Sequence, residues 1–175
     1  MEHYQDLLRV AEEDTGLSEY GPDSFREGLE ILVNAINREA QLNATGQHVL
    51  RERILGHLKQ RLQIEDWYRR HPEIDSEKLV NPLIGLSLPR TGSTALSFLL
   101  AQDPNARSLL RGEAAAPCPP PSTIDSDREQ LVTEAEKVVG WKAHTPTGGD
   151  AAAECQDLMA LDFKSHIFQA FAQIP

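Results

Sequence analysis

Residues 82–94 read Pro-Leu-Ile-Gly-Leu-Ser-Leu-Pro-Arg-Thr-Gly-Ser-Thr, and this stretch decides the fold. The apolar run at 83–88 lies between two prolines, a pattern typical of a buried strand in a parallel sheet. Residues 89–94 form a tight loop, and the apolar residues 95–101 continue as a helix. The order of strand, loop and helix predicts an α/β fold.

The loop between strand and helix has the chemistry of an oxyanion cradle. A helix that begins directly after a strand presents its first free N–H groups, and the positive end of its dipole, to a ligand. Gly92 lets the backbone come close to that ligand, while Ser93 and Thr94 add hydroxyl donors. Arg90 adds a forked cation that can contact several oxygens at once. We therefore expect a phosphate-like group to bind here.

The loop differs from the nucleotide-binding pattern GxxxxGK[ST] at two positions. Ser87 stands where that pattern has its first glycine, and Ser93 stands where it has its lysine. No acidic strand follows that would hold the magnesium ion of a phosphoryl-transfer enzyme. A degenerate P-loop kinase or NTPase is thus a less favoured alternative, which magnesium-dependent binding of ATP would support.

Outward from the loop toward the N-terminus, residues 1–71 have helical spacing. Ser24 and Glu27 form a capping-box pattern, followed by an apolar stripe. Past Gly46, a second stripe recurs every four positions to the end of the region and predicts a long amphipathic helix. The two stripes consist of Phe25, Leu29, Leu32, Val33 and Ile36, and of Leu50, Ile54, Leu58 and Leu62. Residues 72–82 are polar and rich in turn formers, so we expect a linker there.

Toward the C-terminus, residues 83–175 are expected to form the start of an incomplete α/β domain. A second parallel strand is predicted at about 107–110, so the fold is helix-dominated with one or two strands. From Ala151 the apolar residues have helical spacing and predict a single core helix. These residues are Leu158, Met159, Phe163, Ile167, Phe168 and Phe171.

Composition excludes several classes of protein. A formal net charge of −10 repels nucleic acid, and the apolar runs are far shorter than a membrane span requires. The N-terminal residues carry no secretory signal pattern, so a cytoplasmic location is the default expectation. The two cysteines, Cys118 and Cys155, have neither the spacing of a metal site nor the density of a disulfide scaffold. We therefore expect neither a metal nor a nucleic-acid partner.

Residues 83–121, with Pro-Arg-Thr-Gly-Ser-Thr at 89–94, resemble the phosphosulfate-loop region of the sulfotransferase family in its bacterial branch. The resemblance covers strand, loop, helix, short strand and glutamate. It implies a P-loop-like three-layer α/β fold. It also implies transfer of a sulfuryl group from 3′-phosphoadenosine 5′-phosphosulfate (PAPS) to a hydroxyl or amine, without a metal. The acceptor would be a small molecule, a carbohydrate or a lipid.

The same resemblance assigns roles within the site. It implies donor contacts from the whole loop, which comprises Pro89, Arg90, Thr91, Gly92, Ser93 and Thr94. Arg90 would also be catalytic, by neutralising charge on the bridging oxygen. Glu113 occupies the position from which a glutamate deprotonates the acceptor in several sulfotransferases, so it is the candidate general base.

The resemblance also predicts a deficit. A sulfotransferase needs a downstream arginine and serine that bind the 3′-phosphate of the donor, and neither is found before Pro175. We expect a truncated copy, under half the length of a typical relative, with weak or absent catalysis. The alternative from a different class is a non-catalytic helical interaction module. Self-association without nucleotide affinity would support this alternative. The sequence is also compatible with a homo-oligomer.

Overall fold

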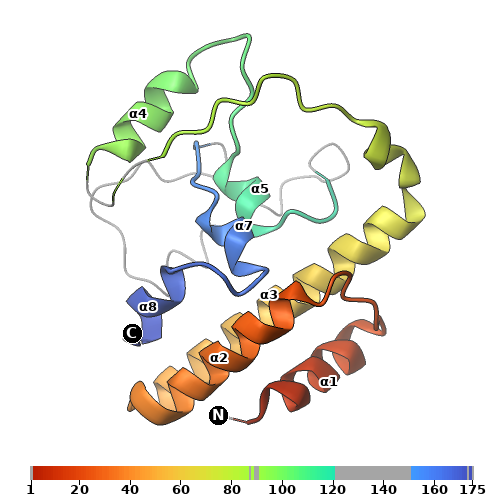
Figure 1. The fold of residues 1–175 in the computed structure, drawn as a ribbon, viewed down its shortest axis with the longest axis vertical. Helices are drawn as coiled ribbons and strands as arrows, with labels where there is room; N and C mark the ends of the chain where they lie inside the picture. Colours follow the sequence, from red (N-terminus) through yellow and green to blue (C-terminus); the bar gives the residue numbers. More distant parts are fainter. Residues whose placement is uncertain (1, 87, 89–90, 121–150, 173, 175) are drawn as a thin grey trace. The chain divides into compact units, whose positions relative to one another are not determined.

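The computed structural model describes residues 2–86, 88, 91–120, 151–172 and 174, drawn in colour in Figure 1. The chain divides into two compact units. The first unit comprises residues 1–69 and 156–175, and the second comprises residues 70–155. Within the described residues both units are built from helices and loops.

The first unit is built on three helices that form as the apolar stripes predict. They are α1 (Tyr4–Thr15), α2 (Ser24–Glu39) and α3 (Ala44–Arg70), and α1 and α2 lie along α3 in Figure 1. Both predicted stripes are buried in one core, which confirms the helices of this region. The core also takes up residues of α1, of the α1–α2 connection and of the C-terminal part, with one more residue of α3: Leu7, Leu8, Ala11, Tyr20, Ala160, Phe163, Phe168, Ala172 and Leu55.

The start of α2 differs from the predicted capping box. Asp23 is the N-cap residue, without a side-chain capping bond, and Ser24 is the first residue of the helix. The hydroxyl of Ser24 donates instead to the carboxylate of Asp162, at 3.3 Å from each oxygen. The prediction of a Ser24–Glu27 box was wrong because a partner 138 residues away takes the hydroxyl.

The single core helix predicted from Ala151 is also wrong. The structure has two short helices, α7 (Gln156–Ala160) and α8 (Ile167–Ala172), with a turn at 161–166 between them. Phe163 lies in that turn with a φ of 53°, in the left-handed region that ends helices. The turn lets the rings of Phe163 and Phe168 stack on each other, 5.8 Å apart, in the core. Packing against α3 therefore outweighs helical spacing.

Arg61 of α3 joins this turn to the start of α2. Its Nη1 lies 2.8 Å from Oδ1 of Asp162, and its guanidinium carbon lies 4.4 Å from the centre of the Phe25 ring. Its Nε donates to the carbonyl oxygen of Tyr20 at 2.7 Å, and its Nη2 donates to that of Pro22 at 3.0 Å. One side chain, 11% exposed, thus holds the α1–α2 connection and the C-terminal turn together.

The environment of Asp162 favours its charged form. Burial raises the pKa of this carboxyl, but the hydrogen bond from Lys164, the charges of Lys164 and Arg61 and the hydroxyl of Ser24 outweigh burial. The pKa of Asp162 therefore lies below its ordinary value.

The second unit contains a 3₁₀ helix, η1 (Pro72–Ser76), and the helices α4 (Ser93–Leu100) and α5 (Arg111–Ala115). Helix α4 confirms the helix predicted after the loop. The strand predicted at 83–88 is not formed in its described residues, where Leu83 is 77% and Leu86 92% exposed. A parallel strand exists only beside a neighbour, and no ladder partner accompanies the described part of this run. At 107–110 a single antiparallel bridge, from Leu110 to Ala152, replaces the second parallel strand.

Candidate functional site

Gly92 begins α4 in a conformation that leaves the helix N-terminus open. Its φ is 87°, and it caps the helix without a side-chain hydrogen bond. The first amide to reach an intrahelical acceptor is that of Leu96, which donates to the carbonyl of Gly92 at 3.1 Å. The N–H groups of Ser93, Thr94 and Ala95 therefore have no acceptor within the helix. Together with the helix dipole they favour an anion at this end.

The hydroxyls around this N-terminus are ordered by the backbone and by one carboxylate. Thr91 Oγ1 donates to the carbonyl oxygen of Leu88 at 2.6 Å. Ser93 Oγ donates to Oε1 of Glu154 at 3.3 Å. Pro89 and Arg90, the other two predicted residues of the loop, lie outside the described residues.

Glu154 lies beside the predicted loop, a neighbour that the sequence did not indicate. The bridge between Leu110 and Ala152 brings its segment to the loop, since the amide of Ala153 donates to the carbonyl of Leu109 at 2.9 Å. Glu154 follows directly, and its carboxylate reaches Ser93. The two residues are 61 positions apart, and no spacing in the sequence indicates the contact. The open end of α4 thus has a negative charge beside it.

Glu113, the predicted base, lies on α5 instead of at the end of a strand. Its Oε2 accepts a hydrogen bond from the Leu110 amide at 3.0 Å, which caps the helix. Its Oε1 accepts from Nη2 of Arg107, whose side chain is 72% exposed while that of Glu113 is 12% exposed. Within the described part of the chain, Glu113 makes no hydrogen bond to residues 91–94. Both of its oxygens are engaged, so an acceptor hydroxyl would have to displace one partner.

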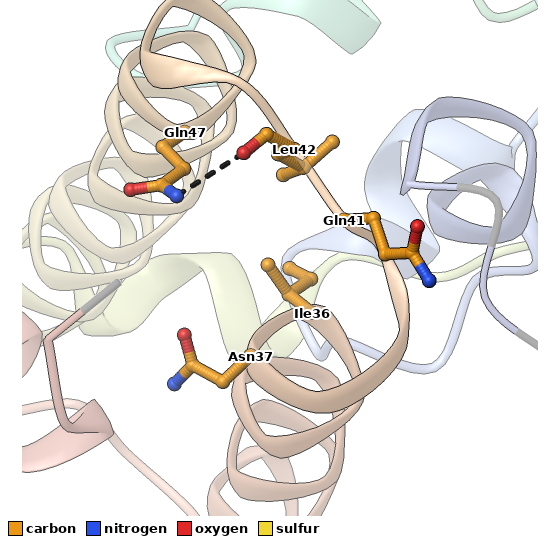
Figure 2. Close-up of a pocket in the computed structure, with 5 residues that line it drawn as sticks. All are labelled: Ile36, Asn37, Gln41, Leu42 and Gln47. Carbon is orange, nitrogen blue, oxygen red and sulfur yellow. Dashed lines mark hydrogen bonds between the residues drawn. The ribbon is translucent and has the colours of Figure 1, made fainter.

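The cavity in Figure 2 belongs to the first unit and has a different character. It has a volume of about 130 Å³ at the connection between α2 and α3. The amide Nε2 of Gln47 donates to the carbonyl of Leu42 at 3.2 Å across it. The other lining residues are Ile36, Asn37 and Gln41. None of the lining side chains titrates, so the cavity offers no acid or base for catalysis.

The described residues contain no group of three or more His, Cys, Asp or Glu residues arranged to hold a metal ion. No helix among them is long and apolar enough to cross a membrane.

Comparison with known proteins adds independent findings. The profile of the Sulfotransferase family matches residues 82–175, just over half of the chain. Sulfotransferase STF9 from Mycobacterium avium is 31% identical, with a TM-score of 0.83 over 98% of this chain and 46% of its own. Sulfotransferase STF1 from Mycobacterium tuberculosis is 28% identical, with a TM-score of 0.82 over 98% of this chain and 50% of its own. The chain thus spans about half the length of these structures. A comparison with curated proteins found no match.

Proposed function

Because the chain belongs to the sulfotransferase family, as residues 89–94 predict, we propose that it binds PAPS at the open N-terminus of α4 and contributes to sulfuryl transfer. The observation that carries the proposal is the set of N–H groups behind Gly92 that have no acceptor within the helix, with the Ser93 hydroxyl beside them. These are the donors that a phosphosulfate needs at a helix N-terminus. The acceptor would be a hydroxyl or amine of a small molecule, a carbohydrate or a lipid, and the location cytoplasmic.

The loop would hold the donor and offset its charge. Residues 89–94 would surround the 5′-phosphosulfate, and Arg90 would neutralise charge that develops on the bridging oxygen. In the transfer, a bond forms between the acceptor oxygen or nitrogen and sulfur while the bond from sulfur to the phosphate oxygen breaks. The proton of the acceptor passes to a base, and adenosine 3′,5′-bisphosphate leaves. The three-layer α/β arrangement of the family is part of the same proposal.

Two carboxylates are candidates for the base. Glu113 is implied by family resemblance, but it must first release Arg107 or the Leu110 amide. Glu154 is favoured by geometry, because it already contacts a serine of the loop and its residue is exposed. A base must come within hydrogen-bond reach of the acceptor proton, and variants of each glutamate test which of the two does so.

Donor binding is the first test. Calorimetry with adenosine 3′,5′-bisphosphate and with PAPS should detect binding that Arg90→Ala and Ser93→Ala weaken. Loss of one hydrogen bond to a charged group costs about 1.5–3 kcal/mol, so Ser93→Ala should weaken binding of PAPS about 10-fold or more. Ser97→Ala is the matched control, since this serine of the same helix donates to the carbonyl of Thr94 instead. Equal affinities for all variants would contradict the proposed site.

The two candidate bases are separated by isosteric variants. Glu154→Gln removes a negative charge beside the anion site, so PAPS should bind more tightly to this variant. If Glu154 is the base, single-turnover transfer should nevertheless fall about 100-fold, as loss of a general base typically costs. If Glu113 is the base, Glu113→Gln alone should show that fall. Binding of ATP that requires magnesium would instead favour a kinase. Self-association without nucleotide affinity would favour an interaction module.

A further inference from the structure

His57 occupies an aromatic seam between α3 and residues 156–172, which we call the C-terminal segment. Its ring meets Phe163 edge-on, at 6.2 Å between centres and 82°, and Phe168 at 5.8 Å and 90°. Nε2 is covered completely and has no hydrogen-bond partner in the described structure. Both contacting rings belong to the C-terminal segment, so His57 is a point at which this segment packs on α3.

The geometry fits the neutral imidazole alone. With the proton on Nδ1, Nε2 carries a lone pair that is buried at modest cost. A second proton would put a charged N–H donor at Nε2, where no acceptor lies. Burial, followed by the charge of Arg53 one turn away, accordingly lowers the pKa of His57 from 6.5 to about 4.

Among the described residues, no charge near His57 is placed to compensate that proton. On α3, the flanking groups one turn away on either side are the cations Arg53 and Arg61. The carboxylate of Asp157, from α7, lies 4.0 Å from Arg53, and that of Asp162, from the turn, pairs with Arg61 and Lys164. Helix α8 presents Phe168, which has no charge. The anions facing the seam are thus already opposite cations.

We propose that protonation of His57 releases the C-terminal segment from α3, so that the seam is a pH-sensitive latch. The segment is the part that moves, because α3 is also held in the core that it shares with α1 and α2, through the buried Leu50, Ile54, Leu55, Leu58 and Leu62. Water reaches Nε2 once Phe163 and Phe168 leave. The C-terminal segment lies within residues 82–175 and His57 lies outside them, so the latch couples part of the family region to the N-terminal helices.

The direction and size of the pH effect on opening of the segment follow from the linkage between proton binding and opening. Above pH 6.5 both the closed and the open states are neutral at His57, and the seam has its full stability. As pH falls from 6.5 toward 4, only the open state takes up the proton, so opening becomes more favourable. At pH 5 the open population should rise about 30-fold.

Hydrogen exchange of the full chain, read by mass spectrometry at pH 7.5 and pH 5 and corrected for intrinsic exchange rates, tests the latch. We expect peptides from 156–172 to lose protection about 30-fold at pH 5, while peptides from α2 and α3 keep theirs. His57→Phe supplies a ring that cannot titrate, so its C-terminal segment should be equally protected at both pH values. His48→Phe, at an exposed histidine of the same helix, should behave like the wild-type chain.

Three results would each overturn the latch. The first is equal protection of residues 156–172 at both pH values in the wild-type chain. The second is an unchanged pH response in His57→Phe. The third, which requires no variant and applies even if His57→Phe does not fold, is an NMR titration in which the His57 ring of the wild-type chain takes up its proton near pH 6.5.

Discussion

Replacing Arg61 with alanine should be among the most costly changes in the first unit. The substitution removes hydrogen bonds to the carbonyls of Tyr20 and Pro22, the pair with Asp162 and the contact with the Phe25 ring. Each hydrogen bond to a carbonyl contributes about 1 kcal/mol, a value at the low end of the range because the groups are partly solvated. The contact with the ring contributes a similar amount. Asp162 is about one-third exposed, so the ion pair adds under about 1 kcal/mol. Allowing for non-additivity, we expect a loss of about 3 kcal/mol in the free energy of unfolding.

Arg9 provides the matched control for this variant. It pairs with Glu13 at the same distance, 2.8 Å, but the two side chains are 60% and 61% exposed. Urea unfolding followed by circular dichroism at pH 7 gives the free energies of both variants. Arg9→Ala should match the wild-type chain within experimental error. Equal losses for the two variants would refute the reasoning, because burial and the carbonyl contacts would then contribute nothing.

Four further single substitutions can each be checked by urea unfolding. A Cβ at Gly28 of α2 would lie 2.8 Å from the carbonyl oxygen of Phe163, so Gly28→Ala should cost about 1–3 kcal/mol. Gly56 of α3 has open space at that position, so Gly56→Ala should stabilise by about 0.5–1 kcal/mol, and the same sign for both glycines would contradict the packing described. Gly92→Ala must adopt a φ of 87°, so it should cost about 1 kcal/mol and weaken PAPS binding, whereas unchanged affinity would show that the turn is unimportant. Because its pKa is lowered, the charged Asp162 stabilises the fold at pH values above the ordinary aspartate pKa. The loss of unfolding free energy in Asp162→Asn should therefore be largest at pH 7 and shrink below about pH 4. A loss that does not change with pH would contradict this.

The parts of the fold that the sequence predicted are those with local causes. Helices α2 and α3 follow from apolar side chains three and four positions apart, which bury one face whatever lies opposite. Helix α4 follows from the loop that begins it. The family could be recognised from residues 89–94, because their chemistry is concentrated in six consecutive positions.

The errors arose where distant residues decide local structure. At the break between α7 and α8, Asp162 pairs with Arg61, which is 101 positions away, and aromatic side chains pack against α3. Glu154 reaches Ser93 through a single bridge that no periodic pattern announces. Strand formation at 83–88 likewise depends on neighbours that a local apolar run does not specify. Local spacing thus predicts helices well, but it does not predict their partners.

Residues 79–88 make a purified sample of this chain prone to aggregation. Their leucine, isoleucine and valine side chains are 73–92% exposed where described, which makes the segment a template for pairing between molecules. Pro82 lies within the segment and, having no amide donor, limits such growth. Mutual repulsion from the net charge of −10 opposes it too, but salt screens that repulsion. Storage in dilute buffer should therefore keep the sample clear for longer than storage in concentrated salt, even though the helices are equally folded in both.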